Sequence, residues 1–139
     1  MPVSVFVGLT VVFFVFTDGT LVFTKEPSNT VYVLRGNNLT LKWEFYIDNK
    51  PPADFKFATW DVFVEGVGWR KMIGEDTDGS VFIHNERPPL YSGRVEKRDQ
   101  ATLIVKNMTF EDSSEYRCVL TALDGGRTEG VVKVIVAGM

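Results

Sequence analysis

Short stretches of alternating apolar and polar residues run along this chain from residue 21 to residue 136. The most regular stretch is 39–47, in which the apolar positions are Leu39, Leu41, Trp43, Phe45 and Ile47. A period of two places successive side chains on opposite faces of a strand, so one face of this strand is expected to lie in a core. The same reasoning predicts strands at 21–24, 30–34, 39–47, 55–64, 69–73, 81–84, 91–95, 101–105, 115–120 and 128–136.

Turn-forming residues separate these stretches. Pro27 removes a backbone donor between the first two predicted strands, and Pro51-Pro52 lies in a predicted loop at 48–54. Gly66, Gly68 and the Asp124-Gly125 pair are typical of tight turns between strands. No stretch shows a convincing helical pattern. Roughly nine or ten strands, with turns about every 8–12 residues, predict an all-β fold, an antiparallel β-sandwich.

The N-terminus has a different composition. Residues 3–16 are almost wholly apolar and carry no charge. A run of about 14 residues suits a secretory leader better than a membrane span, which needs about 20. We therefore expect a signal peptide at 1–19 and a mature domain at 20–139, which is secreted or is the outer part of a longer receptor with a membrane span downstream. No Lys or Arg precedes the run and no small-x-small cleavage site follows it, so an uncleaved anchor and a buried strand are the alternatives.

Composition and charge exclude several classes of function. The 139 residues are 45% hydrophobic, enough for one buried core, and the formal net charge of −3 argues against nucleic-acid binding. The chain has one histidine, His84, and one cysteine, Cys118, so neither a multi-histidine metal site nor a paired-cysteine site is expected. The acidic segment 74–78 lacks the ligand spacing of an EF-hand. We expect that the chain is not an enzyme and that it binds no cofactor.

Two N-glycosylation sequons support the secretory interpretation. They are Asn38-Leu39-Thr40 and Asn107-Met108-Thr109, at the start of a predicted strand and in a predicted turn. Each three-residue pattern alone is a weak signal. Together with the apolar leader, they predict exposed positions at Asn38 and Asn107 in an extracellular protein.

Asp112, Ser114, Tyr116 and Cys118 stand at alternate positions shortly after the predicted strand at 101–105. This Asp-x-Ser-x-Tyr-x-Cys run closely resembles the start of strand F in immunoglobulin domains. In that family the tyrosine turns its hydroxyl back to the backbone and fixes the corner before the strand. An ordinary half-buried strand tyrosine is the alternative for Tyr116. The resemblance extends over about residues 21–136 and implies an immunoglobulin-like β-sandwich.

The spacing of two further features resembles the variable (V-set) type of this family. In that type a core tryptophan, here Trp60, is followed about a dozen residues later by a short apolar strand, here Met72-Ile73. The resemblance also implies an ion pair between Arg94 and Asp112, which in the family closes the bottom of the sandwich. Two solvated charges are the alternative, and a partly exposed pair would stabilise the fold by only about 0–1 kcal/mol.

The chain departs from the family at the inter-sheet disulfide. Cys118 matches the second cysteine of the family, but Trp43 occupies the position of the first, so no intrachain disulfide can form. We hypothesise that Trp43, Trp60, Tyr116 and the Cys118 thiol pack into one cluster that replaces the covalent link. The rival interpretation is a surface Cys118 that forms an intermolecular disulfide. Strand alternation favours the buried thiol, because it puts Cys118 in phase with Tyr116 and Leu120.

If Trp60 faces the core, the residues at alternate positions on neighbouring strands share the opposite face. That predicted binding face carries Phe57, Thr59, Asp61, Phe63, Arg70, Glu115, Arg117, Val119 and Thr121. Exposed aromatic residues among charges of both signs are typical of an interface core with a polar rim. In the family this face is the usual surface for homophilic and heterophilic pairing. The alternative is that the hairpin at 55–73 shields the rings within the monomer.

These residues and the resemblance predict an extracellular recognition domain of the immunoglobulin superfamily. Its expected partner is another protein at the cell surface, in adhesion, immunity or allorecognition, including the same domain on an opposing cell. The alternative function is a secreted module that binds carbohydrate or a foreign surface. We expect no contact with nucleic acid and no membrane contact by the domain itself. Residues 128–131 lack the Phe-Gly-x-Gly bulge of antigen receptors, so antibody-like pairing is not expected.

Overall fold

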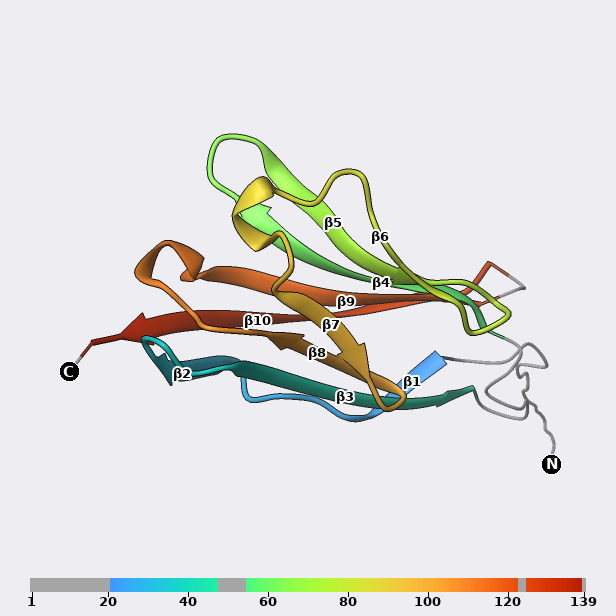
Figure 1. Cartoon of the computed structure of the whole chain (residues 1–139). Coiled ribbons are helices and arrows are strands. Elements are labelled where there is room, and N and C mark those ends of the chain that lie inside the picture. Colours follow the sequence, from blue (N-terminus) through green and yellow to red (C-terminus); the bar gives the residue numbers. More distant parts are fainter. Residues whose placement is uncertain (1–20, 48–54, 123–124, 139) are drawn as a thin grey trace, which may run out of the picture.

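The computed structural model describes residues 21–47, 55–122 and 125–138 (Figure 1). The predicted leader and the predicted loop at 48–54 lie outside the described residues, as does Asp124 of the last predicted turn. Within the described ranges no helix is long and apolar enough to cross a membrane.

The strands form two sheets that pack face to face (Figure 1). The four-stranded sheet has the order β1 (Leu21–Lys25), β3 (Leu39–Ile47), β8 (Ala101–Val105) and β7 (Val95–Arg98). The six-stranded sheet has the order β2 (Thr30–Leu34), β10 (Arg127–Ala137), β9 (Ser114–Ala122), β4 (Phe55–Val64), β5 (Gly68–Glu75) and β6 (Val81–Ile83). Two short 3-10 helices are η2 (Pro89–Tyr91) and η3 (Phe110–Asp112). The all-β sandwich predicted from the sequence is confirmed.

The N-terminal segment crosses from one sheet to the other. β1 pairs antiparallel with β3, whereas β2 runs parallel to β10, with Thr30 opposite Lys133. Pro27 lies between β1 and β2, where its missing N–H interrupts the ladder. The sandwich therefore contains one parallel pair in addition to the antiparallel pairs that the sequence predicts.

The prediction of a strand at 91–95 is wrong. η2 ends at Tyr91, and the following strand, β7, begins only at Val95. Pro88 and Pro89 fix their φ angles and lack an N–H, which favours a turn over a ladder strand. Gly93 then adopts a φ of 74°, a left-handed conformation that interrupts an extended strand.

Aromatic side chains fill the centre of the space between the sheets. Trp43, Trp60, Tyr116 and Cys118 are each fully buried and belong to one cluster. Trp60 lies opposite Cys118 in the ladder between β4 and β9. The Tyr116 hydroxyl donates a hydrogen bond of 2.6 Å to the backbone oxygen of Asp112, which fixes the corner before β9. The residues proposed to replace the disulfide thus lie together in the core.

Gly130 makes room for Trp43. Gly130 lies opposite Cys118 in the ladder between β10 and β9. A Cβ atom at position 130 would come within 2.7 Å of Trp43 Nε1, closer than real Cβ contacts allow. The indole on β3 therefore occupies the space beside Cys118 only because β10 carries no side chain at this point. Trp43 on one sheet and Gly130 on the other thus have complementary sizes.

Two ion pairs connect segments at the edges of the sandwich. Arg94 binds the fully buried Asp112, and its guanidinium also donates to the backbone oxygens of Leu90 at 2.9 Å and Asn107 at 3.1 Å. The hydrogen bond to Asp112 raises the pKa of Arg94. Glu75 on β5 lies 3.3 Å from Lys97 on β7, which links the two sheets directly. Because these pairs are mostly buried, removing one partner leaves an uncompensated charge.

We expect Gly130→Ala to lower the free energy of unfolding by about 1–3 kcal/mol, because it overpacks a filled core. Urea denaturation measures this loss. Trp43→Phe shortens the facing side chain, so the double variant should lose less than the sum of the two single variants. Strictly additive losses would show that the two positions are not coupled.

Burial raises the pKa of the Cys118 thiol well above its ordinary value, and the Asp61 carboxylate adds to this shift. The thiolate is the reactive form, so the native protein should react with a disulfide reagent at pH 8 much more slowly than the urea-unfolded protein. A thiol with a raised pKa contributes stability that is complete below its unfolded pKa, about 8.5, and is lost as the pH rises. The free energy of unfolding should therefore fall above about pH 8.5, less steeply in Cys118→Ala. Rapid labelling of the native protein would contradict a buried thiol.

Candidate binding face

The outer face is the side of the six-stranded sheet that points away from the core. Strand register, rather than sequence spacing, decides which side chains lie on it. Residues on this face include Tyr32, Leu34, Phe57, Thr59, Asp61, Phe63, Trp69, Lys71, Phe82, Glu115, Arg117, Val119, Thr121, Glu129 and Val131. The face thus combines aromatic rings with charges of both signs.

Arg117 lies at the centre of the outer face and is held on several sides. Its Nε donates to Asp61 Oδ2 at 2.7 Å, and its guanidinium lies 4.4 Å from the centre of the Trp69 ring. Glu129 Oε1 lies 3.9 Å from Arg117 Nη1 and 3.0 Å from Arg127 Nη2. A guanidinium with a carboxylate on one side and an indole face on another is fixed before any ligand binds.

A small depression, the central hollow, lies beside Arg117. Its volume is about 170 Å³, and its lining includes Phe57, Asp61, Lys71 and Arg127. Asp61 is fully buried, and its Oδ1 atom has no hydrogen-bond partner in the described part of the chain. Such a buried acceptor is costly unless a donor reaches it. The central hollow presents the cations Lys71 and Arg127, whereas the Asp61 Oδ1 beneath it is not exposed to a ligand.

Three residues of the predicted binding face are buried on it. Thr59, Asp61 and Val119 have exposed fractions of 5%, 0% and 4%, because long neighbouring side chains such as Arg117 lie over this part of the sheet. All three line the central hollow instead of projecting from the face. Phe63 is half-buried and packs edge-on against Trp69, with ring centres 5.5 Å apart. The hairpin thus shields one predicted ring in part.

The prediction for Arg70 is wrong. In the hairpin of β4 and β5, Arg70 lies opposite Val62, a core residue, and so does not share the outer face. Trp69 and Lys71 take the outer positions, opposite Phe63 and Asp61. The sequence does show that Trp69 and Lys71, two positions apart, share one face of β5. Deciding which face this is requires the register of the turn before β5, because a shift of one residue exchanges the two faces.

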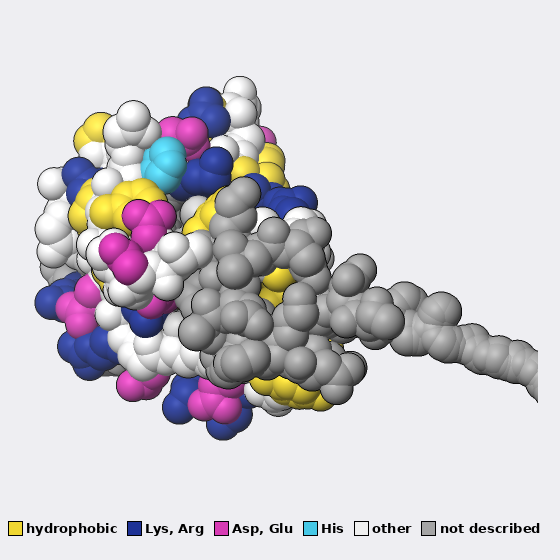
Figure 2. Space-filling model, turned by 90° about the vertical axis from the view of Figure 1, so that its right-hand side faces the viewer, with side chains coloured by type: hydrophobic (Ala, Val, Ile, Leu, Met, Phe, Trp, Pro, Cys, Tyr) yellow, Lys and Arg dark blue, Asp and Glu magenta, His cyan; other side chains and the backbone are white. Residues whose placement is uncertain are grey.

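Apolar side chains that the sequence analysis did not select lie towards both edges of the outer face. Tyr32 on the edge strand β2 is 70% exposed, and Val131 on the neighbouring β10 is 42% exposed. On the opposite edge strand, β6, the ring of Phe82 lies over Gly74. Figure 2 shows hydrophobic side chains gathered beside His84, the cyan residue, whose ring centre is 6.2 Å from that of Phe82.

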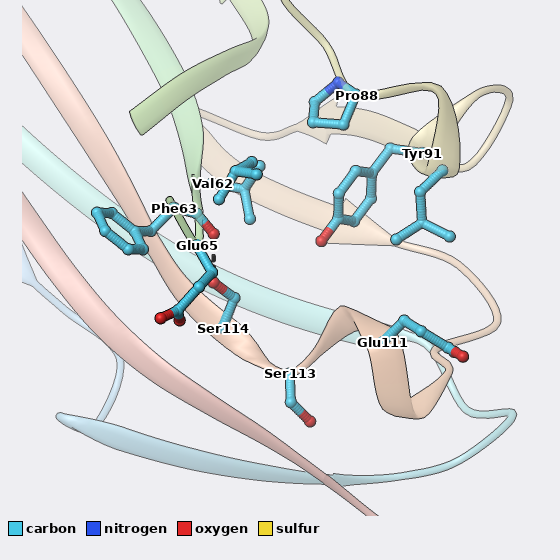
Figure 3. Close-up of a pocket in the computed structure, with 10 residues that line it drawn as sticks. Val62, Phe63, Glu65, Pro88, Tyr91, Glu111, Ser113 and Ser114 are labelled. Atoms are coloured by element: carbon cyan, nitrogen blue, oxygen red, sulfur yellow. Dashed lines mark hydrogen bonds between the residues drawn. The ribbon is translucent and has the colours of Figure 1, made fainter. Parts of the chain in front are cut away.

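A second depression, the end hollow, lies at the end of the sandwich where β4 finishes (Figure 3). It has a volume of about 250 Å³ and is lined by residues 62–65, by η2 with Pro88, and by residues between η3 and the start of β9. The Tyr91 hydroxyl points into it, and burial raises the pKa of Tyr91 to about 12. A neighbouring depression of about 380 Å³ shares four of its lining residues and extends towards β10.

The described residues offer surfaces on which a ligand can bind. No group of three or more His, Cys, Asp or Glu side chains within these ranges is placed to hold a metal ion. His84 accepts a weak hydrogen bond from the backbone N–H of Glu86 at 3.3 Å, and the buried Cys118 thiol is not a nucleophile at neutral pH. The arrangement can present a fixed guanidinium, aromatic rings and two hollows to a ligand.

Comparison with solved structures identifies the fold. The chain matches murine CRIg with 16% identity and a TM-score of 0.63, covering 86% of this chain and 99% of that one. It matches the two tandem V-type regions of VCBP3, a v-region-containing chitin binding protein, with 17% identity and a TM-score of 0.67, covering 92% of this chain and 50% of that one. The first Ig-like domain of human CD48 antigen matches with 23% identity and a TM-score of 0.56, over 78% of this chain and 81% of that one. No protein-family model and no curated protein sequence matches the chain.

We expect Arg117→Met to lower the free energy of unfolding by about 3–5 kcal/mol, because it leaves the Asp61 carboxylate buried without its partner. Asp61→Asn in the same background should recover much of this loss by removing the unpaired charge. Arg127→Met is the matched control, since its ion pair with Glu129 is largely exposed and should contribute only about 0–1 kcal/mol. Chemical denaturation of each variant measures these losses and shows which one is larger. Equal losses for Arg117→Met and Arg127→Met would show that Asp61 does not depend on Arg117.

Proposed function

We propose that this chain, which has the fold of a variable-type immunoglobulin domain, is an extracellular recognition domain that binds another protein through its outer face. The main support for this proposal is the position of the Arg117 guanidinium, which is held between Trp69 and Asp61 at the centre of that face. A side chain that is already fixed loses little conformational entropy on binding. Aromatic residues and arginines are also the side chains that most often dominate protein interfaces.

Exposed apolar residues around this centre support a protein partner. Tyr32 and Val131 lie on adjacent strands of the outer face and are both well exposed. They extend the contact area beyond the charged centre, as expected for an apolar interface core with polar surroundings. The hairpin of β4 and β5 shields the ring of Phe63 in part, but it does not cover Tyr32 or Val131.

The distribution of charge makes a second copy of this domain the first candidate partner. Lys71 and Arg127 line the central hollow towards one end of the outer face, whereas Glu65, Glu115 and Lys133 border the depression at the other end. In a two-fold symmetric complex a residue of one copy meets a different residue of the other copy, and the reverse contact forms as well. Charges of both signs across the face allow such self-complementary pairing, in adhesion or immune-type recognition between opposing cells.

An extracellular location is part of this proposal. The apolar leader at 1–19 supports secretion. The sequon residues Asn38 and Asn107 are both exposed, and Asn38 Oδ1 accepts a hydrogen bond of 3.0 Å from the backbone N–H of Asn107. The two sequons therefore lie in neighbouring turns, one before β3 and one after β8. We propose that they carry glycans there, away from the outer face.

A secreted carbohydrate-binding module is the second candidate. The central hollow favours it, because sugar hydroxyls can accept hydrogen bonds from Lys71 and Arg127, whose side chains line it. The Phe57 ring in the lining offers an apolar surface for a sugar ring. One structural neighbour, VCBP3, is a v-region-containing chitin binding protein.

We expect Tyr32→Asp and Val131→Asp each to weaken protein binding at least about tenfold, since a charge would be buried in the interface. Sedimentation of the protein over a concentration series measures self-association, and an avidity-enhanced screen against cell-surface ectodomains detects other partners. Tyr46→Asp is the matched control, because Tyr46 is an exposed tyrosine on the opposite sheet, at 45%.

A strict monomer that binds no ectodomain would contradict the proposal. Binding that is lost in Tyr46→Asp but retained in Tyr32→Asp and Val131→Asp would assign recognition to the four-stranded sheet instead. Binding to chitin oligomers that depends on Lys71, in the absence of any protein partner, would favour the second candidate.

A further inference from the structure

We propose that the end hollow is a second binding site, which takes the basic side chain of a protein partner, an arginine or a lysine. It lies away from Arg117 and the centre of the outer face, but its ligand belongs to a protein partner and Glu65 also borders that face, so the inference rests in part on the proposed function. Its lining comes from three segments that are distant in the sequence (Figure 3).

The floor of the end hollow is apolar. Val62 and Tyr91 are buried, and Val64 and Pro88 are half-buried around them. A volume of about 250 Å³ is open to solvent on one side and is of the size of one long side chain. Such a floor suits the aliphatic stem of arginine or lysine, which packs on apolar surface while the charged end reaches polar groups.

Hydrogen-bond direction makes most polar groups of the hollow acceptors. Tyr116 has a single hydroxyl proton and donates it to the Asp112 carbonyl at 2.6 Å, so the 2.9 Å contact with Tyr91 uses the Tyr91 proton. The Tyr91 oxygen, which points into the hollow, is then left with lone pairs alone (Figure 3). Ser114 likewise donates its proton to the Phe63 carbonyl at 2.5 Å. Ser113 is the lining hydroxyl whose proton is not assigned to a partner.

The charge of the lining points the same way. Glu65 and Glu111 stand on different sides of the hollow (Figure 3), both exposed, and neither forms an ion pair in the described part of the chain. No Lys or Arg lines the end hollow. Lys133 lines the neighbouring depression. Arg94, whose guanidinium lies 5.6 Å from the centre of the Tyr91 ring, is already bound to Asp112 and to backbone oxygens of neighbouring loops. Two carboxylates without a protein counter-ion favour a cationic ligand.

The matching ligand is therefore a multiple donor with a positive charge and an apolar stem. A guanidinium presents five donors in a plane and an ammonium presents three, and neither has an acceptor that would face the lone pairs of Tyr91 or Ser114. Neutral or acidic side chains would leave these acceptors or the two carboxylates unmatched. A loop or tail of a partner protein presents such a side chain at low entropic cost when it is already ordered.

Titration of the ¹⁵N-labelled protein with N-acetyl-arginine amide tests the proposal by NMR. We expect fast-exchange shifts at the amides of Glu65, Tyr91 and Ser114, with millimolar affinity. N-acetyl-citrulline amide has nearly the same shape without the charge and should cause much smaller shifts. Glu65→Gln with Glu111→Gln should weaken arginine binding at least tenfold, whereas Glu129→Gln on the outer face should leave it unchanged.

Several results would overturn the inference. These are the absence of shifts around the end hollow, equal shifts with citrulline, or arginine binding that persists in the Glu65→Gln, Glu111→Gln variant while its melting temperature is unchanged. Binding of spermidine without binding of the arginine or lysine amide would replace the proposed side chain by a free polyamine. Loss of partner binding in Tyr32→Asp with intact arginine shifts would separate this site from the outer face.

Discussion

The contact between the Trp43 indole and the backbone of Gly130 is the interaction on which the rest of this sandwich depends. With one cysteine, the chain has no covalent link between its sheets, and the indole on β3 fills the space between them beside Cys118. A disulfide of this kind contributes about 2–5 kcal/mol, mainly by restricting the unfolded chain. Burial of an indole acts instead on the folded state, through apolar area removed from water and dense packing. The position of the β9–β10 layer over β3 is thus set by the shape of the packed side chains.

Buried charge is the second constraint, and it lies at two separate places in the sandwich. Arg94 and Asp112 lock the corner before β9, and Arg117 and Asp61 lock the middle of the outer face. A buried pair adds little net stability, but the loss of either partner is costly. The packing of the outer face therefore holds Arg117 in one place, and the same arrangement that satisfies Asp61 presents a fixed cation at the surface. Structure and recognition share these residues.

Much of the fold followed from the sequence, because period-two patterning and the Asp112-to-Cys118 spacing are local properties. Trp43, with its strict alternation on β3, was readily placed in the core. The side chain of Arg70 was placed on the wrong face, because the faces of β5 depend on the register of a turn that composition does not specify. The burial of Asp61 was also hidden, since it depends on an arginine 56 positions away that covers it. The end hollow could not be foreseen at all, because its walls come from separate segments and its acceptor character depends on hydrogen bonds between Tyr91 and Tyr116.

The crossing of the N-terminal segment at Pro27 has a mechanical consequence. β1 is an edge strand of one sheet and β2 of the other, so a single stretch of chain ties both layers together. Because β2 and the last strand, β10, run side by side in the same direction, a force that pulls β2 and β10 apart along their length loads their hydrogen bonds in shear. The bonds must then break together instead of one after another, as they would in a peeling hairpin. A domain that joins two surfaces under tension would be strengthened in this way, without any covalent cross-link.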